Sequence, residues 1–231
     1  RLDHSMIAHR LGLLTEELAD DASRFDCEHF WCIDPLDGTK PYAEGRSGYA
    51  VSIALESRSG APQIGVVHDP HTQTTFHAIK DAGASRIDER GTSGAQATPD
   101  QLTWFMDRSM RSLPSFPGIA EAVAHLASEA GLDRVLQVDH AGAALNGCWV
   151  ATSAPAIYVK LPKSSAGGGS VWDFAASACF VTECGGSATN IKGKPLDLNP
   201  GDSTFMNRHG VLYASNAQLA DALGNRLATT P

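Results

Sequence analysis

The segment from Trp31 to Thr39, which reads WCIDPLDGT, carries the residues best suited to chemistry. Pro35 lacks an amide donor and has a fixed φ, so we expect the apolar strand to end there and the following turn to bring Asp34 and Asp37 to one side. Two carboxylates facing a common point suit Mg²⁺, which prefers hard oxygen ligands. Gly38 lets the backbone approach an oxyanion closely, and the Thr39 hydroxyl can orient an attacking water.

Two other acidic segments could complete such a site. The pair Glu16 and Glu17 follows an apolar stretch, and Asp173 lies in VWDFAA, ten residues before the sequence ECGG. Each segment also has a simpler interpretation. The two glutamates could be solvated charges at a strand end, and Asp173 could cap its helix, where a carboxylate is favoured by free amides and the helix dipole. For Asp173, capping and metal binding are compatible.

Together, the three segments resemble the signatures of the inositol monophosphatase superfamily, which includes the 3'(2'),5'-bisphosphate nucleotidases and is related to fructose-1,6-bisphosphatase. The resemblance implies an α/β (α+β) fold of layered α/β/α/β/α type. It also implies a phosphomonoesterase that uses two or three Mg²⁺ ions, is inhibited by lithium and forms a homodimer.

The resemblance also implies roles for individual residues. The metal ligands would be Glu17, Asp34, the carbonyl of Leu36, Asp37 and Asp173. Glu17 and Thr39 would position the attacking water, while the amides of Gly38 and Thr39 would hold the phosphate. Asp3 resembles an aspartate that contacts the motif threonine in the family. We expect the chain to start late, without the helical segment that precedes this aspartate in the family. The distance from Asp3 to Glu17 is also shorter than usual, so either a loop is missing from the sequence or this branch of the family trims it.

Substrate contacts are expected in the second half of the chain. Gly142 and Ala143 resemble a helix start that lines the family's substrate pocket through its backbone. Lys160 and Lys163 stand where inositol phosphatases have an acidic residue, so these lysines could reach a second phosphate; they could equally be ordinary surface charges. We therefore expect 3'-phosphoadenosine 5'-phosphate as the substrate, with inositol 1-phosphate as the alternative. A catalytically silent binding module with the same fold is a further alternative.

Composition narrows the class of protein. The 231 residues carry a formal charge of −8, which argues against nucleic acid as a partner because such binding needs a basic surface. A small phosphorylated metabolite remains compatible, since bound metal ions would supply the positive charge. No apolar run is long enough to span a membrane, and we expect a cytoplasmic protein. The five cysteines include no Cys-x-x-Cys pair, so neither a disulfide framework nor a zinc site is predicted.

The elements expected to position these residues alternate between strands and helices. In the first half, β-rich stretches separated by Gly, Pro, Asn or Asp residues predict a mostly antiparallel sheet. Its strands are expected at residues 12–16, 29–34, 48–55, 63–67 and 74–78. Residues 80–101 read as an irregular excursion and 102–106 as a strand. Helices are predicted at 119–130, 141–151, 172–184 and 215–227, the last capped by Ser215. We expect two halves, residues 1–110 and 111–231, that form one catalytic unit.

Overall fold

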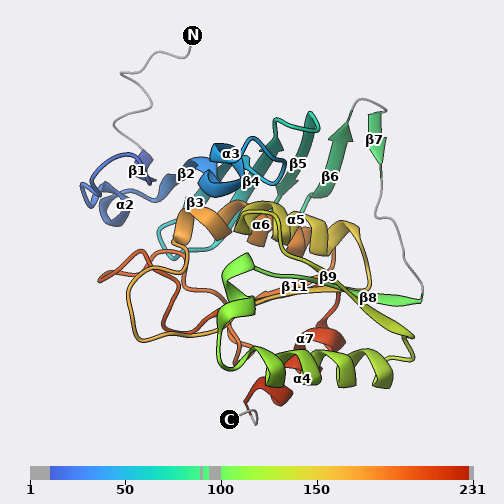
Figure 1. The fold of residues 1–231 in the computed structure, drawn as a ribbon. Helices are drawn as coiled ribbons and strands as arrows, with labels where there is room; N and C mark the ends of the chain where they lie inside the picture. The colour runs from blue at the N-terminus through green and yellow to red at the C-terminus, as the bar shows by residue number, and fades with distance from the viewer. Residues whose placement is uncertain (1–10, 89–90, 94–99, 229–231) are drawn as a thin grey trace.

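The computed structural model describes residues 11–88, 91–93 and 100–228, which form four stacked layers (Figure 1). A seven-stranded sheet is followed by a layer of two helices, a five-stranded sheet and a second layer of two helices. The expected mixed α/β class is confirmed. Within the described residues, the layers run β/α/β/α, which accounts for four of the five layers that we expected.

The first sheet contains strands β1 to β7 in sequence order. The strands are β1 (Leu11–Thr15), β2 (His29–Asp37), β3 (Ala50–Ser57), β4 (Pro62–Asp69), β5 (Thr74–Ile79), β6 (Gly83–Asp88) and β7 (Gly91–Ser93). Strand β1 pairs parallel with β2 and all other neighbours are antiparallel, so the predicted antiparallel sheet is confirmed. The expectation of an irregular segment at 80–101 is wrong, because it contains β6 and β7. Two short helices, α2 (Ser23–Asp26) and α3 (Thr39–Ala43), follow β1 and β2.

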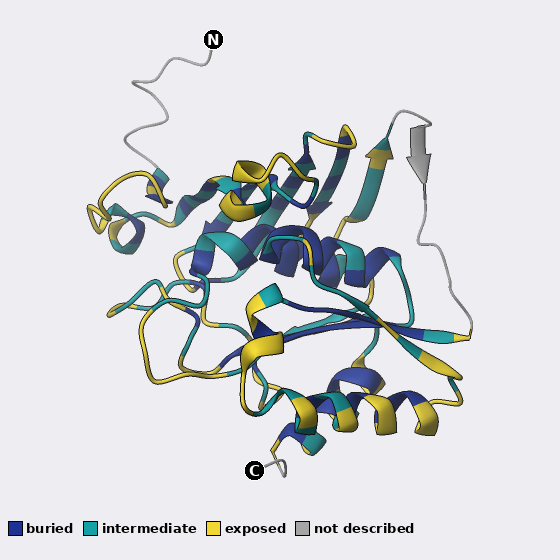
Figure 2. Ribbon diagram, in the orientation of Figure 1, coloured by how far each residue is buried: buried dark blue, intermediate teal, exposed yellow. Residues whose placement is uncertain are grey.

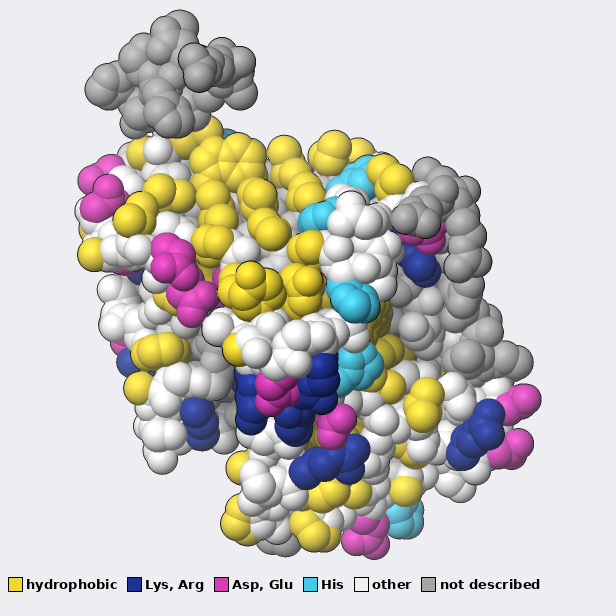
Figure 3. Space-filling model, turned by 45° about the horizontal axis from the view of Figure 1, so that its top comes forward, with side chains coloured by type: hydrophobic (Ala, Val, Ile, Leu, Met, Phe, Trp, Pro, Cys, Tyr) yellow, Lys and Arg dark blue, Asp and Glu magenta, His cyan; other side chains and the backbone are white. Residues whose placement is uncertain are grey.

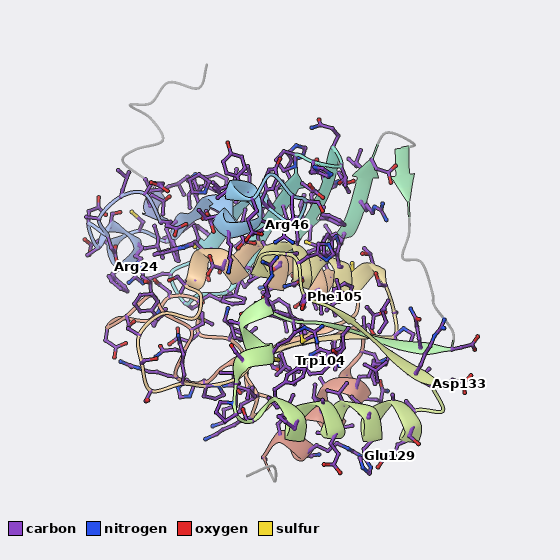
Figure 4. All side chains as sticks on the ribbon, viewed as in Figure 1. Arg24, Arg46, Trp104, Phe105, Glu129 and Asp133 are labelled. Carbon is purple, nitrogen blue, oxygen red and sulfur yellow. The ribbon has the colours of Figure 1, made fainter. Side chains whose placement is uncertain are left out.

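The second sheet was largely missed by the sequence reasoning. It contains β8 (Gln101–Phe105), β9 (Arg134–Val138), β10 (Ala156–Lys160), β11 (Ser187–Thr189) and β12 (Val211–Ala214), in the order β11-β12-β10-β8-β9. Only β8 was predicted, and it already belongs to this sheet although it precedes residue 111. The sheet is covered on both faces (Figure 2). Neighbouring side chains of β8 therefore bury in opposite directions: Trp104 stacks on Phe116 and Phe105 lies against Trp149 (Figure 4).

Four longer helices complete the layers. Helices α5 (Ala143–Thr152) and α6 (Val171–Glu183) lie between the sheets, and α4 (Phe116–Glu129) and α7 (Ala217–Leu227) cover the outer face of the second sheet. All four predicted helices are confirmed, but the predicted cap of the last one is wrong. Asn216 accepts the Leu219 amide at α7, whereas the Ser215 hydroxyl accepts the Ala156 amide. No helix in the described ranges is long and apolar enough to cross a membrane.

The outer face of the first sheet is apolar across five strands (Figure 3). The strand register aligns one row of side chains that alternates with the residues buried against α6. The row consists of Leu13, Trp31, Leu55, Ile64 and Ile79. Leu13 and Ile79 are 38% and 51% exposed. Helices α5 and α6 cover only the opposite face (Figure 1).

That opposite face packs so closely against α6 that one position admits only glycine. A Cβ atom on Gly65 of β4 would lie 2.3 Å from the carbonyl oxygen of Ala176 in α6 and 2.9 Å from the Cβ of Cys179. The helix could not keep its place above the sheet if such an atom were added, because backbone atoms cannot move aside as a flexible side chain can.

We predict that Gly65→Ala lowers the free energy of unfolding by about 1–3 kcal/mol, since it forces α6 away from the sheet. Urea denaturation measures the change. Gly201→Ala is the matched control because no atom lies within 4 Å of the added methyl group. Equal stability of the two variants would contradict the prediction.

Candidate metal and phosphate site

A β-bulge in β2 places Asp34 and Asp37 on the same side of the sheet. Asp34 pairs with Ser52 and Asp37 pairs with Ala50, so a span of three residues on β2 opposes a span of two on β3. In a regular strand, side chains three positions apart point to opposite faces, and the extra residue of the bulge cancels that difference. Our expectation that Pro35 ends the strand is wrong: the ladder resumes at Asp37 after the irregularity around Pro35.

The third carboxylate comes from the first turn of α6. The Asp173 carboxylate accepts the Ser170 amide at 2.7 Å and takes part in a capping box at the helix start. Each of Asp34, Asp37 and Asp173 offers one oxygen, and the three oxygens lie within 4.8 Å of one another. Asp173 therefore both caps the start of α6 and belongs to the carboxylate cluster.

Asp37 joins the two halves of the molecule at the start of α5. Its two carboxylate oxygens accept the amides of Ala143 at 3.3 Å and Ala144 at 2.8 Å. A Cβ atom on Gly142 would lie 2.3 Å from Asp37 Oδ2, so another residue there would displace the Asp37 carboxylate from its position. Gly142 and Ala143 were predicted to contact substrate through their backbone, and they do line the cavity described below. The Ala143 amide, however, is already donated to Asp37.

Backbones from three segments meet directly beside this contact. The Gly142 amide donates to the carbonyl of Gly48 at 2.9 Å. A Cβ atom on Gly48 would lie 2.3 Å from the His140 carbonyl oxygen, and one on Gly38 would lie 2.6 Å from the Gly48 carbonyl oxygen. Gly38 and Gly48 also have positive φ angles of 84° and 106°. We call Gly38, Gly48 and Gly142 the glycine seam.

Burial and mutual repulsion raise the pKa values of the clustered acids. Burial raises the pKa of Asp34 to about 9, assisted by its hydrogen-bonding contact with Asp173 and the charge of Asp37. Burial and the Asp173 charge raise the pKa of Asp37 to about 8, although the α5 amides and Lys160 act in the opposite direction. Burial also raises the pKa of Asp173. Ionising all three acids together therefore requires nearby positive charge.

The adjacent glutamates differ in their relation to the cluster. The Glu16 amide donates to the Ile33 carbonyl at 3.3 Å, which holds Glu16 beside Asp34. The Glu16 carboxyl contacts Asp34 by a hydrogen bond, and its pKa is raised chiefly by burial. Glu17 is the ligand expected from the resemblance; both glutamates are exposed and neither is among the three clustered aspartates, but only Glu16 has a contact with Asp34. Sequence reasoning noted the pair and expected Glu17 as the ligand, whereas the contact with the cluster is made by Glu16.

The remaining residues of the motif lie around the same point. The Leu36 amide donates to Asp34 Oδ1 at 2.8 Å, and the Leu36 carbonyl accepts the Thr39 hydroxyl at 3.3 Å. Gly38 and Thr39 begin α3 and line the cavity that holds Asp37 and Asp173. Asp3 lies outside the described residues.

The cavity has a volume of about 760 Å³ and contains both predicted lysines. Lys160 Nζ is 2.7 Å from Asp107 Oδ2 and 5.4 Å from the centre of the Phe174 ring. The buried Tyr158 hydroxyl donates to the other oxygen of Asp107 at 2.9 Å. Lys160 is thus held in place beside the aspartates, whereas Lys163 forms no ion pair with any described residue. Sequence reasoning missed Asp107, because nothing near it marks a lone aspartate after β8 as a partner for Lys160.

The donor set fits a divalent cation of the magnesium type. The buried carboxylates of Asp34 and Asp37, the half-buried one of Asp173 and the nearby Glu16 provide hard oxygen donors, which Mg²⁺ prefers. The adjoining cavity would leave room for water and for a phosphate.

Comparison with known proteins agrees with this geometry. The model of the inositol monophosphatase family matches residues 6–226. A 3'(2'),5'-bisphosphate nucleotidase from Emericella nidulans is 29% identical over 222 residues, covering 81% of this chain and 59% of its own length. An inositol-1-monophosphatase from Synechocystis is 27% identical over 236 residues, covering 99% of this chain and 70% of its own length.

A solved structure shares the architecture. The inositol monophosphatase from Anabaena superposes with a TM-score of 0.70 at 26% identity, covering 98% of this chain and 81% of that one. With the family match spanning nearly every residue, and with Asp34, Asp37 and Asp173 gathered at one point, this chain belongs to the inositol monophosphatase family.

Proposed function

We propose that the protein is a Mg²⁺-dependent phosphomonoesterase that hydrolyses a small phosphorylated metabolite, with 3'-phosphoadenosine 5'-phosphate as the preferred substrate. The observation that carries the proposal is the cluster of Asp34, Asp37 and Asp173 beside a cavity that also contains cationic side chains. The relatives named as a bisphosphate nucleotidase and an inositol-1-monophosphatase support the reaction class. Inositol 1-phosphate is the alternative substrate.

The metal would be held by Asp34, Asp37, Asp173 and the carbonyl of Leu36. When bound, Mg²⁺ supplies positive charge that lowers the pKa of a bound water and balances the phosphate. The raised pKa values of Asp34 and Asp37 support this assignment, because these acids need a nearby cation to ionise together.

The chain's own groups would orient and deprotonate the attacking water. We assign the role of general base to Glu16, because its carboxyl contacts Asp34 and it is the member of the glutamate pair next to the cluster. The Thr39 hydroxyl, which donates to the Leu36 carbonyl, would hold the water in line with the phosphorus atom. The backbone at Gly38 and Thr39 would face the phosphate oxygens.

The proposed preference for a bisphosphate substrate rests on the two lysines that line the cavity. Lys160 is fixed by Asp107 near the aspartates, so it would contact the phosphate that reacts, while Lys163 is available to a second anionic group. A monophosphorylated polyol would leave Lys163 without a partner.

We predict that Asp34→Asn lowers kcat/KM by about 100-fold or more for phosphate release from 3'-phosphoadenosine 5'-phosphate with Mg²⁺, because a metal-ligating charge is lost. The melting temperature without metal should be unchanged or higher, since the substitution removes a buried, mutually repelling acid. Full activity in this variant would contradict the metal assignment. A folded wild type that binds Mg²⁺ but releases phosphate from no tested ester would favour the silent binding module.

A second prediction separates the two glutamates. Glu16→Gln should lower kcat by about 100-fold, because Gln cannot accept the proton of the water. Glu17→Gln is the matched control, and its activity should stay within about twofold of wild type, as for other exposed substitutions. A larger loss in Glu17→Gln than in Glu16→Gln would overturn the assignment of Glu16.

A third prediction concerns pH. The pKa of Asp34 is about 9 in the folded, metal-free protein and 3.8 in the unfolded chain. Between these two pH values, Asp34 is therefore protonated in the folded state and ionised in the unfolded state. Stability without metal should therefore fall as pH rises towards 9. Mg²⁺ must displace these protons, so its stabilising effect should grow with pH. Melting temperatures with and without Mg²⁺ from about pH 6 to about pH 9 test this; an equal Mg²⁺ shift at all pH values would contradict it.

A further inference from the structure

The proposed hydrolysis needs a proton acceptor and a proton donor on opposite sides of the phosphorus atom. In-line displacement places the attacking water and the leaving oxygen roughly in line through phosphorus. The assigned base, Glu16, contacts Asp34, and neither residue lines the cavity of about 760 Å³. The alcohol of the substrate needs room, so we expect the leaving oxygen to face that cavity, which Asp37 and Asp173 also line.

The acids of the cavity wall are poor candidates for the proton donor. Asp107 accepts from the Lys160 ammonium at 2.7 Å, and Asp139 forms an ion pair with Arg111. Carboxylates paired with cations accept protons rather than donate them, and an ammonium group is a weak acid near neutral pH. An imidazole is the side chain suited to giving up a proton at that pH. His140 is the only histidine among the described residues that line the cavity.

The main chain at His140 is held firmly beside the cluster, whereas its ring nitrogens have no partner. A Cβ atom on Gly48 would lie 2.3 Å from the His140 carbonyl oxygen, so these two segments touch. The segment continues into α5, whose first two amides are donated to Asp37. The centre of the imidazole lies 5.3 Å from the centre of a Trp149 ring. Within the ranges that the structure describes, no hydrogen bond or ion pair occupies a nitrogen of His140, so the exposed ring is available to a ligand in the cavity.

We propose that His140 is the general acid that protonates the leaving oxygen of the substrate. The proposal rests on the phosphomonoesterase function and adds a catalytic residue to it. As the water oxygen bonds to phosphorus, the bond from phosphorus to the ester oxygen breaks and its electron pair stays on the ester oxygen. That oxygen takes the proton of the His140 imidazolium, while Glu16 takes a proton from the water. Proton exchange with solvent then restores both side chains.

The test varies the leaving group, because only a poor leaving group needs a proton. Adenosine 3',5'-bisphosphate and inositol 1-phosphate release an aliphatic alcohol, whereas 4-nitrophenyl phosphate releases a phenolate that is stable as an anion. All three are assayed by phosphate release with Mg²⁺ in wild type and in His140→Gln. The matched control is His125→Gln, since His125 is an exposed histidine on α4 that does not line the cavity.

We expect His140→Gln to lower kcat by about 100-fold for each aliphatic ester that the wild type hydrolyses. The same variant should change kcat for 4-nitrophenyl phosphate by less than about twofold, which a loss of folding or of metal binding would not produce. His125→Gln should leave all values within about twofold of wild type.

Failure of the inference and failure of the proposed function give different results. A fall in kcat of equal size for all esters in His140→Gln, or no fall for any of them, overturns the role of His140 and leaves the phosphomonoesterase intact. A wild type that hydrolyses only 4-nitrophenyl phosphate lacks a proton donor and likewise overturns the role. A wild type that hydrolyses none of the three compounds overturns both.

Discussion

Repulsion among three clustered carboxylates, two of them buried and one half-buried, is the constraint around which the site is built. Asp34, Asp37 and Asp173 crowd within 4.8 Å, where burial and like charge oppose their ionisation. Several groups in the fold lower the free-energy cost of ionising these carboxylates. Helices α5 and α6 both begin at the cluster and donate amides to Asp37 and Asp173, and the Lys160 ammonium lies close by. These contributions offset the repulsion only in part, since the pKa values remain raised, and a divalent cation would supply the missing charge.

The acidic residues of the site could be recognised from the sequence, but two details of their placement could not. The bulge depends on how β3 pairs with β2, and no local pattern around Pro35 distinguishes a bulge from a strand end. The choice between Glu16 and Glu17 has a similar origin. Successive side chains of an extended segment point in opposite directions, so the ligand depends on exactly where β1 ends against β2.

The strands of the first sheet were easier to predict from the sequence than those of the second sheet, for a physical reason. Strands of the first sheet have one face against α6, so apolar and small buried residues alternate along β3 and β4 in a way that sequence reveals. In the second sheet, β10 and β12 are buried on both faces and are short apolar runs without alternation. Helices α4 to α7 were found because an apolar stripe or apolar run continued over enough turns, with breakers at their ends.

The glycine seam links the packing of the two halves to the geometry of the metal site. Gly38, Gly48 and Gly142 let the backbones of the two halves touch directly, so neither half can rotate relative to the other without breaking that contact. The geometry of the three aspartates is therefore coupled to the way the two halves pack. A side chain at Gly48 would push the His140 carbonyl away and separate the halves, so it would disturb the carboxylates without touching any of them. The metal site thus depends on residues that carry no chemistry of their own.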